Sequence, residues 1–241
     1  AEGDYYFHYR SGDGIKIHRG IGADTSEESL WLNGTVYAAI ASMNGLLPIH
    51  ASAVAFDGSV FAFTGPAGAG KSTLAAALGR HGLPLFCDDT LVFDLSSPDR
   101  IMCLPGHKRL KLRDDAFGLT GAAREEKVSR TYDKYYAAPA AGTVGSALPM
   151  AELIFLEDGP APVMTRISGS ERFVRMQDDH QTSYLFEAAR KFNRSEQFAH
   201  RARLARHIQM AQFERPRDPA QFDKAVSLIA EYINGRRRLS A

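Results

Sequence analysis

The residues with the clearest chemistry occupy positions 65–73. They match G-x-x-x-x-G-K-[ST], the phosphate-binding P-loop, in which backbone N–H groups surround a β-phosphate. In order, they are Gly65, Pro66, Ala67, Gly68, Ala69, Gly70, Lys71, Ser72 and Thr73. We predict that they bind a nucleoside triphosphate, with Lys71 at the β- and γ-phosphates and Ser72 at Mg²⁺. Lys71 is expected to face solvent, to contact only phosphates and to add little to packing.

A pair of carboxylates follows at Asp88 and Asp89, directly after the apolar run 83–87. A buried strand that ends in aspartate is the Walker B arrangement, whose carboxylate meets Mg²⁺ beside a P-loop. One of two adjacent aspartates can contact the metal while the other accepts a proton from a substrate hydroxyl. Since neighbouring strand residues point to opposite sides, we do not expect them to share a role. The alternative is a solvated turn that uses aspartate for its backbone geometry.

Two strands and a helix must position these groups. The apolar run 60–64 predicts a strand before the P-loop, and the Ala- and Leu-rich run 73–80 predicts a helix after it. A second strand, 50–56, joins the first through Asp57-Gly58, a pair typical of two-residue hairpins. With that tight turn, His50 falls opposite Gly65, at the mouth of the P-loop. His50 therefore meets the γ-phosphate or merely caps the strand edge.

The residues described so far, together with the run Ile-His-Ala-Ser-Ala-Val at 49–54, resemble the HPr kinase/phosphorylase family, in particular its shorter HPr-kinase-related branch. The likeness is dense over 48–94. It is looser at 104–112, which is similar to the L-P-G-x-x-x-L-K-L stretch of that branch. The resemblance implies an α/β P-loop kinase related in fold to phosphoenolpyruvate carboxykinase. It also implies a mixed sheet flanked by helices, and we expect a small N-terminal antiparallel hairpin.

The resemblance also implies roles for individual residues and cofactors. It places His50, Asp88 and Asp89 in the catalytic site beside the P-loop Lys71, with Asp88 as the base that activates an acceptor serine. It implies that Ser72 and Asp89 bind Mg²⁺ and that ATP and Mg²⁺ are the cofactors. True members of the family form hexamers, so a homo-oligomer is possible.

A departure from the family pattern bears on which molecule accepts the phosphoryl group. The E-[IV]-R-G-x-G signature of true HPr kinases is absent after the aspartate pair, and some relatives phosphorylate a serine of lasso-peptide precursors. We therefore expect a serine on a peptide or small protein, such as a lasso-type precursor. HPr itself, a small-molecule acceptor and a non-enzymatic nucleotide-dependent switch are the alternatives. No N-K-x-D or L-S-G-G-Q motif supports a GTPase switch or a transport ATPase.

Composition favours an ordinary globular protein. Of 241 residues, 44% are apolar and 24% charged, and the net charge of +1 gives no reason to expect a nucleic-acid partner. No apolar run reaches 18 residues and no signal-peptide layout opens the chain, so we expect no membrane partner. Cys87 and Cys103 are expected to be reduced and packed, which favours the cytoplasm. We expect a single domain over 1–241, with an N-terminal flank (1–47), a nucleotide-binding core (48–170) and a helical C-terminal part (171–241).

Two polar stretches leave alternatives open. In 104–112, Arg109 and Lys111 share one face of a predicted strand, either to neutralise phosphoryl charge or as a solvated face. The segment 125–136, with Arg130, Lys134 and three tyrosines, is a mobile loop over the site or a surface excursion.

The remaining elements follow from periodicity and turn signals. Strands are expected at 5–10, 15–18, 152–156 and 163–167. Helices are expected at 35–44, 114–119, 183–207 and 220–233. Arg236, Arg237 and Arg238 are expected to form a frayed charged tail.

Overall fold

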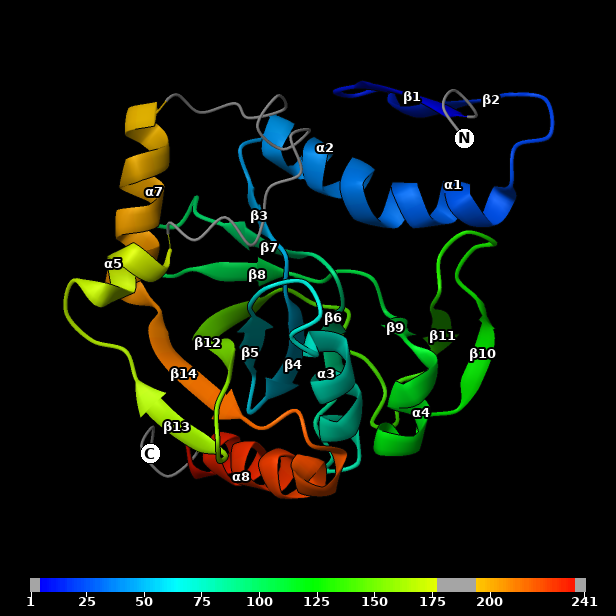
Figure 1. Cartoon of the computed structure of the whole chain (residues 1–241). Helices are drawn as coiled ribbons and strands as arrows, with labels where there is room; N and C mark the ends of the chain where they lie inside the picture. The colour runs from blue at the N-terminus through cyan, green and yellow to red at the C-terminus, as the bar shows by residue number, and fades with distance from the viewer. Residues whose placement is uncertain (1–4, 177–193, 237–241) are drawn as a thin grey trace.

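Strands alternate with short helices along the chain, as a computed structural model of residues 5–176 and 194–236 describes it (Figure 1). The helical segments are α1 (Thr25–Trp31), the π-helical turn η1 (Leu32–Val36), α2 (Tyr37–Met43), α3 (Lys71–Gly79), α4 (Asp114–Thr120), α5 (Glu171–Arg175), α7 (Arg194–His207), the 3₁₀ turn η2 (Pro219–Gln221) and α8 (Phe222–Gly235). The strands are β1 (Tyr5–Arg10), β2 (Gly14–Arg19), β3 (Leu47–Ile49), β4 (Ser52–Phe56), β5 (Ser59–Thr64), β6 (Leu85–Cys87), β7 (Leu91–Asp94), β8 (Met102–Leu104), β9 (Leu110–Leu112), β10 (Arg124–Lys127), β11 (Tyr135–Ala137), β12 (Leu148–Asp158), β13 (Val163–Arg166) and β14 (Gln209–Arg215).

A mixed sheet lies at the centre of the molecule. Within the described residues it has nine strands, in the order β3-β7-β8-β12-β5-β4-β6, with β14 added to β12 and β13 added to β14. Strand β12 runs parallel to both β5 and β14, while the other pairs in the sheet are antiparallel. The mixed α/β architecture and the N-terminal antiparallel hairpin agree with the sequence prediction.

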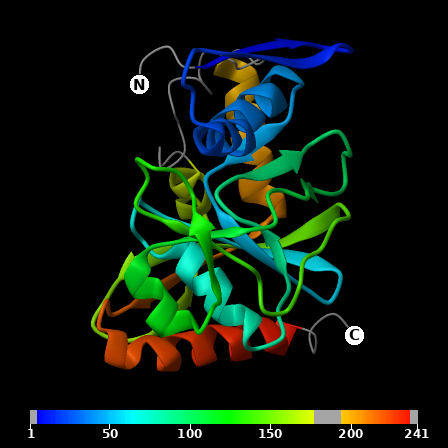
Figure 2. The ribbon, with the colours of Figure 1, turned by 90° about the vertical axis from the view of Figure 1, so that its right-hand side faces the viewer.

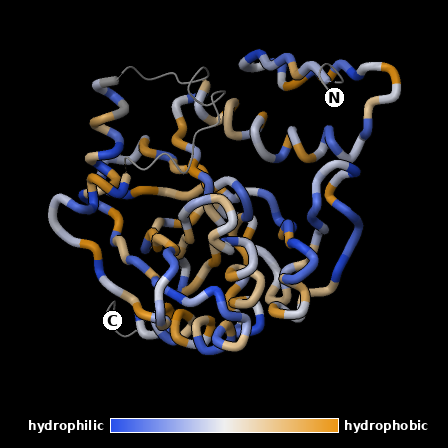
Figure 3. The backbone as a smooth tube through the Cα atoms, viewed as in Figure 1, coloured by the Kyte–Doolittle hydropathy of each residue, from blue (hydrophilic) through white to orange (hydrophobic). Residues whose placement is uncertain are grey.

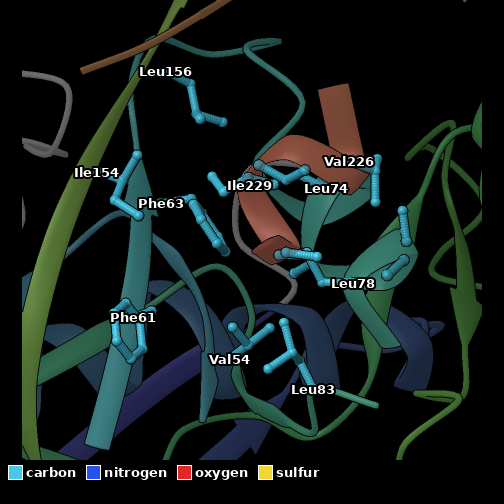
Figure 4. Packing of buried hydrophobic residues seen from close by; sticks show 14 of the residues in the cluster. Val54, Phe61, Phe63, Leu74, Leu78, Leu83, Ile154, Leu156, Val226 and Ile229 are labelled. Carbon is cyan, nitrogen blue, oxygen red and sulfur yellow. The ribbon is translucent and has the colours of Figure 1, made fainter. Parts of the chain in front are cut away.

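Both faces of this sheet are buried, which explains its nearly continuous apolar strands. Along β5, Phe61 and Phe63 join one core cluster while Val60 and Ala62 join the other. Helices α3, α4 and α8 supply the first cluster, part of which Figure 4 shows, and α7 contributes to the second. The amphipathic helix predicted over 220–233 is confirmed as α8. It buries positions spaced by three and four residues: Phe222, Ala225, Val226, Ile229, Ala230 and Ile233.

The hairpin before the P-loop has the predicted register. Phe56 pairs with Ser59 and Ser52 pairs with Phe63. Asp57 and Gly58 both have positive φ, at 49° and 71°, as a two-residue type I′ turn requires. The strand predicted over 50–56 is wrong at its start, because the chain breaks pairing at His50 and divides into β3 and β4.

An N-terminal layer lies over one end of the sheet (Figures 1 and 2). It consists of the hairpin β1–β2 and a helical run from Thr25 to Met43 that passes through the π turn η1. The helix predicted over 35–44 begins ten residues too late, because Asp24 caps the run by accepting a hydrogen bond from the Ser26 amide at 2.9 Å. The predicted end at Gly45 is confirmed, since this glycine has a φ of 81° after the last turn.

The C-terminal part departs from the helical prediction. Residues 194–207 form α7, and the rest of the predicted helix, 183–193, lies outside the described residues. Strand β14 was not predicted, although it pairs with β12 along its whole length. Arg236 is no frayed tail: its guanidinium binds both oxygens of the buried Glu152, at 2.7 and 2.8 Å. Arg237 and Arg238 lie outside the described residues.

Two smaller predictions concern packing and the membrane. Cys87 and Cys103 are buried free thiols, as expected. No helix within residues 5–176 and 194–236 has the length and apolar character that crossing a bilayer requires.

Candidate functional site

The P-loop has the strand–loop–helix context that its sequence predicts. Strand β5 ends at Thr64 and α3 begins at Lys71, two residues earlier than predicted. Gly70 adopts the left-handed conformation, with φ of 81°, and its carbonyl accepts the first helical hydrogen bond, from Leu74 N at 2.9 Å. Its φ favours glycine, and a Cβ at this position would also displace the end of the Arg215 side chain.

Lys71 does not face solvent as the sequence suggested. Its side chain is buried, and its ammonium donates to the carbonyls of Gly65 at 2.9 Å and Pro66 at 3.1 Å. Burial, with help from the nearby charge of Lys134, lowers the pKa of Lys71 from 10.5 to about 8. The lysine therefore belongs to the packing of the loop, and a bound anion would stabilise its charged form.

The two aspartates have different surroundings. Asp88 is 1% exposed, and its carboxylate accepts hydrogen bonds from Ser52 Oγ at 2.6 Å and the Lys111 amide at 2.9 Å. Each of its oxygens therefore has a donor, and Asp88 does not line the pocket beside the P-loop. In this arrangement Asp88 fixes strand β9 to the end of β6.

Asp89 lines that pocket instead. Its φ of 73° is in the left-handed region, which breaks the alternation expected of a continuing strand. One carboxylate oxygen accepts from Lys111 Nζ at 2.9 Å, and the other lies 3.5 Å from His50 Nδ1. Burial alone would raise the pKa of Asp89, but Lys111 and His50 outweigh it and lower the pKa. Asp89 is therefore an ionised carboxylate held in place beside the phosphate loop.

His50 supports the backbone of Asp89. Its Nδ1 lies 2.7 Å from the Asp89 carbonyl oxygen, which can only accept, so Nδ1 carries the proton. Burial and the charge of Lys71 lower the pKa of His50 below 6.5, which keeps the ring neutral at pH 7. His50 also lines the pocket. Its position therefore fits both suggested roles, contact with the γ-phosphate and capping of the strand edge.

The alternation of residues in the predicted strand over 104–112 does not describe the burial of Lys111. Leu110 and Leu112 are buried in the core, as alternation predicts, but Lys111 is buried too, at 3% exposure. The solvated strand face is therefore wrong for Lys111. The Arg109 side chain points away from the pocket. It pairs with Glu125 and Glu126 and stacks on the ring of Tyr136.

Two further pocket residues come from the segment 125–136. This segment is a hairpin of β10 and β11, whose connecting loop brings Tyr132 and Lys134 to the pocket. Figure 3 shows β10 as hydrophilic along its length, which is why the sequence suggested only a loop. Thr131 donates a hydrogen bond to Glu27 of α1 at 2.6 Å, which joins the loop to the N-terminal layer. The surface-excursion interpretation is therefore wrong for Tyr132 and Lys134.

The assembled pocket has a volume of about 360 Å³ and suits an anion. Among the described residues its lining carries four cationic and two acidic side chains, a net charge of +2 with His50 neutral. They are Lys71, Lys111, Arg113 and Lys134, against Asp89 and Asp115. Ser72, Thr73 and the glycines Gly68 and Gly70 complete the phosphate side.

Comparison with known proteins shows distant structural likeness. No protein-family model matches the chain, and no curated protein matches it. Among solved structures, the HPr(Ser) kinase/phosphatase from Coxiella burnetii is similar, with a TM-score of 0.42 and 15% sequence identity. The match covers 80% of this chain and 92% of that one. A likeness this distant says nothing about the chemistry of this chain.

Proposed function

We propose that this chain is an ATP-dependent kinase that transfers the γ-phosphoryl group to a serine hydroxyl of a peptide or small protein. One observation carries the proposal: the P-loop residues Lys71 and Ser72 and the ionised Asp89 line the same cationic pocket. Phosphoryl transfer needs this combination, because a phosphate cradle must lie beside a group that accepts the hydroxyl proton.

In this proposal Asp89 takes the role of base that the family resemblance assigned to Asp88. The acceptor hydroxyl gives its proton to the Asp89 carboxylate as its oxygen attacks the γ-phosphorus, and the bond to the β-phosphate oxygen breaks to leave ADP. Lys111 holds the Asp89 carboxylate in position and His50 holds the Asp89 backbone, while Lys71 and Lys134 stabilise the charge on the transferring group.

The pocket fits a magnesium ion bound mainly by phosphate. Within the described part of the chain, no group of three or more His, Cys, Asp or Glu side chains is arranged so that it could hold a metal ion. Kinase Mg²⁺ needs no such cluster, because it takes one or two protein oxygens together with phosphate and water. Ser72 would supply a protein oxygen, while Asp89, as the base, stays free to accept the hydroxyl proton. The ion would neutralise phosphate charge during transfer.

A transfer assay with candidate acceptors tests the proposal. The protein is incubated with γ-labelled ATP, Mg²⁺ and, in turn, HPr, a lasso-type precursor peptide and small alcohols, and mass spectrometry then locates the phosphate. Phosphoserine on a polypeptide is the expected result. Label on a small alcohol would favour a small-molecule kinase, and nucleotide binding without transfer to any acceptor would favour a switch.

Undiminished transfer in excess EDTA would contradict the Mg²⁺ requirement.

A pH dependence follows from the buried lysine. The Lys71 ammonium attracts phosphate only while protonated, and its pKa of about 8 in the free protein means that the charge is lost as pH rises above 8. ATP–Mg²⁺ affinity is therefore expected to fall several-fold between pH 7.5 and 9, approaching tenfold per unit at the upper end. Isothermal titration calorimetry at both pH values measures this.

Lys71→Arg is the matched control, because a guanidinium keeps its proton throughout this range. Its affinity is expected to stay constant between the two pH values, whatever its absolute strength. An equal loss in both proteins would show that another group titrates.

A further inference from the structure

Trp31, at the end of α1, is a large apolar residue outside the core. It is the single tryptophan of the chain, and it is 46% exposed. Helix α1 has no buried residue, so the fold does not depend on Trp31 as a core side chain. None of the roles assigned above uses it.

Contacts with the pocket loop show which way this face of α1 points. Glu27 accepts the hydrogen bond from Thr131, and Asp24, the cap of the helix, lies 3.6 Å from the guanidinium of Arg130. Figure 1 shows the β10–β11 loop reaching towards α1. Trp31 follows Glu27 by four residues, so the two share one helix face, and an aromatic side chain on a helix points back over the preceding turn. The Trp31 ring therefore lies on the side of α1 that meets the loop.

The same helical run also passes the proposed base. Gly34, in the π turn η1, is buried, and a Cβ at this position would lie 3.4 Å from Asp89 Oδ2. Trp31 precedes Gly34 by three residues, which is about 5 Å along a helix axis. Trp31 is therefore placed between the contact with the pocket loop and the contact with the base.

The loop supplies a second exposed aromatic ring. Tyr132 directly follows Thr131, lines the pocket and is 39% exposed. Trp31 lies outside the pocket lining, so a ligand that fills the pocket and continues beyond it would pass from Tyr132 to Trp31. Tryptophan and tyrosine side chains give large apolar contact areas and contribute strongly to binding at interfaces. We call Trp31 and Tyr132 the aromatic pair.

The charge around Trp31 favours a polypeptide over a nucleic acid or a phosphate chain. Helix α1 carries Glu27 and Glu28 in its first turn and is capped by Asp24, and it has no basic residue in its last turn. These carboxylates would repel further phosphate groups. The phosphate-binding cations lie in the pocket, and the aromatic pair extends the pocket on the side of the base.

We propose that the aromatic pair binds the acceptor polypeptide beside its serine and selects apolar side chains next to that serine. The proposal rests on the proposed function, which places the acceptor hydroxyl at Asp89. It adds the substrate class, a serine with apolar neighbours, and the residues that recognise it, Trp31 and Tyr132.

The single tryptophan allows a direct test, because indole fluorescence moves to shorter wavelength in apolar surroundings. The probes are two short synthetic peptides with a central serine, flanked on both sides by leucine in one and by glycine in the other. We expect the leucine peptide to shift Trp31 emission and to have a KM at least about tenfold lower than that of the glycine peptide. In Trp31→Ala the two KM values should lie within about threefold, at unchanged kcat and ATP–Mg²⁺ affinity.

Three further variants test whether the effect is specific. Tyr132→Ala should reduce the KM difference from the loop side, and it keeps the folded α1 if Trp31→Ala does not. Trp31→Phe retains an apolar ring and should restore most of the difference. Tyr6→Ala is the matched control, because Tyr6 is an aromatic residue of the same N-terminal layer, 68% exposed, that lies on β1 and lines no part of the pocket. It should leave both KM values unchanged, and an equal loss there would contradict a specific role of the aromatic pair.

The outcomes separate this inference from the proposed function. If ATP–Mg²⁺ binds but no polypeptide is ever labelled, the proposed function fails. If a polypeptide is labelled while the two peptides do not differ in KM or emission, or while Trp31→Ala and Tyr132→Ala keep the difference, only the inference is overturned. Emission that shifts with the concentration of the protein alone would show that a second copy covers Trp31, which would also overturn the inference.

Discussion

Asp89→Asn is expected to lower phosphoryl transfer roughly 10²–10⁴-fold while ATP–Mg²⁺ affinity stays within about threefold of wild type. Asparagine cannot accept the hydroxyl proton, but its amide oxygen can still accept from Lys111 Nζ, which lies 2.9 Å from Asp89 in the native protein. Asparagine also tolerates the left-handed backbone, φ of 73°, so the fold around position 89 should persist. Transfer kinetics and calorimetric titration with and without Mg²⁺ measure the two effects separately.

Asp88→Asn is the matched comparison. The Asp88 carboxylate accepts two hydrogen bonds in a buried position, from Ser52 Oγ and the Lys111 amide. An asparagine NH₂ would oppose the Lys111 amide, or would require the Ser52 hydroxyl to turn and accept instead of donate. The expected result is a loss of about 1–3 kcal/mol in the free energy of unfolding, measured in urea, with a smaller fall in transfer than for Asp89→Asn. If Asp88→Asn instead loses transfer at full stability, and Asp89→Asn loses only Mg²⁺-dependent nucleotide binding, then Asp88 is the base and Asp89 the metal ligand.

Lys71→Ala is the second substitution with a large expected effect. It removes the ammonium that would stabilise the transferring phosphoryl group, so we expect transfer to fall roughly 10²–10³-fold, together with weaker ATP binding. The loop carbonyls of Gly65 and Pro66 lose a donor, but they lie beside an open pocket where water can replace it. The free energy of unfolding should therefore fall by only about 1 kcal/mol.

Lys108→Ala provides the control for Lys71→Ala. Lys108 also donates to two backbone carbonyls, those of Phe86 and Val144, yet it does not line the phosphate pocket. It should lose stability while keeping most of its transfer activity. Retention of more than about a tenth of wild-type transfer by Lys71→Ala, or equal losses in both variants, would contradict the role of Lys71.

Features encoded by short spacing were predictable from the sequence. The P-loop, its flanking strand and helix, and the register of the Asp57-Gly58 hairpin depend on neighbours within about ten residues. The burial of Asp88 and the position of Asp89 in the pocket were not predictable, because alternation assumes an extended backbone and the left-handed turn at Asp89 breaks it. Long-range packing also places Lys111 and Lys134 beside the P-loop, which the sequence could not predict. Lys111 lies on β9 and Lys134 lies in the loop between β10 and β11, and the pairing of β9 with β11 brings both to the pocket.

The position of β12 determines when the phosphate site can form during synthesis. The P-loop strand β5 pairs on one side with β12, so that Phe63 lies opposite Ile154, and β12 in turn pairs with β14, so that Leu153 lies opposite Met210. Such distant pairings close large loops and are slow to form. A nascent chain that has exposed the P-loop still lacks both supporting strands, and its β5 edge is open to other chains. We therefore expect the site to mature only after β14 has left the ribosome, and chains halted before that point to depend on chaperones.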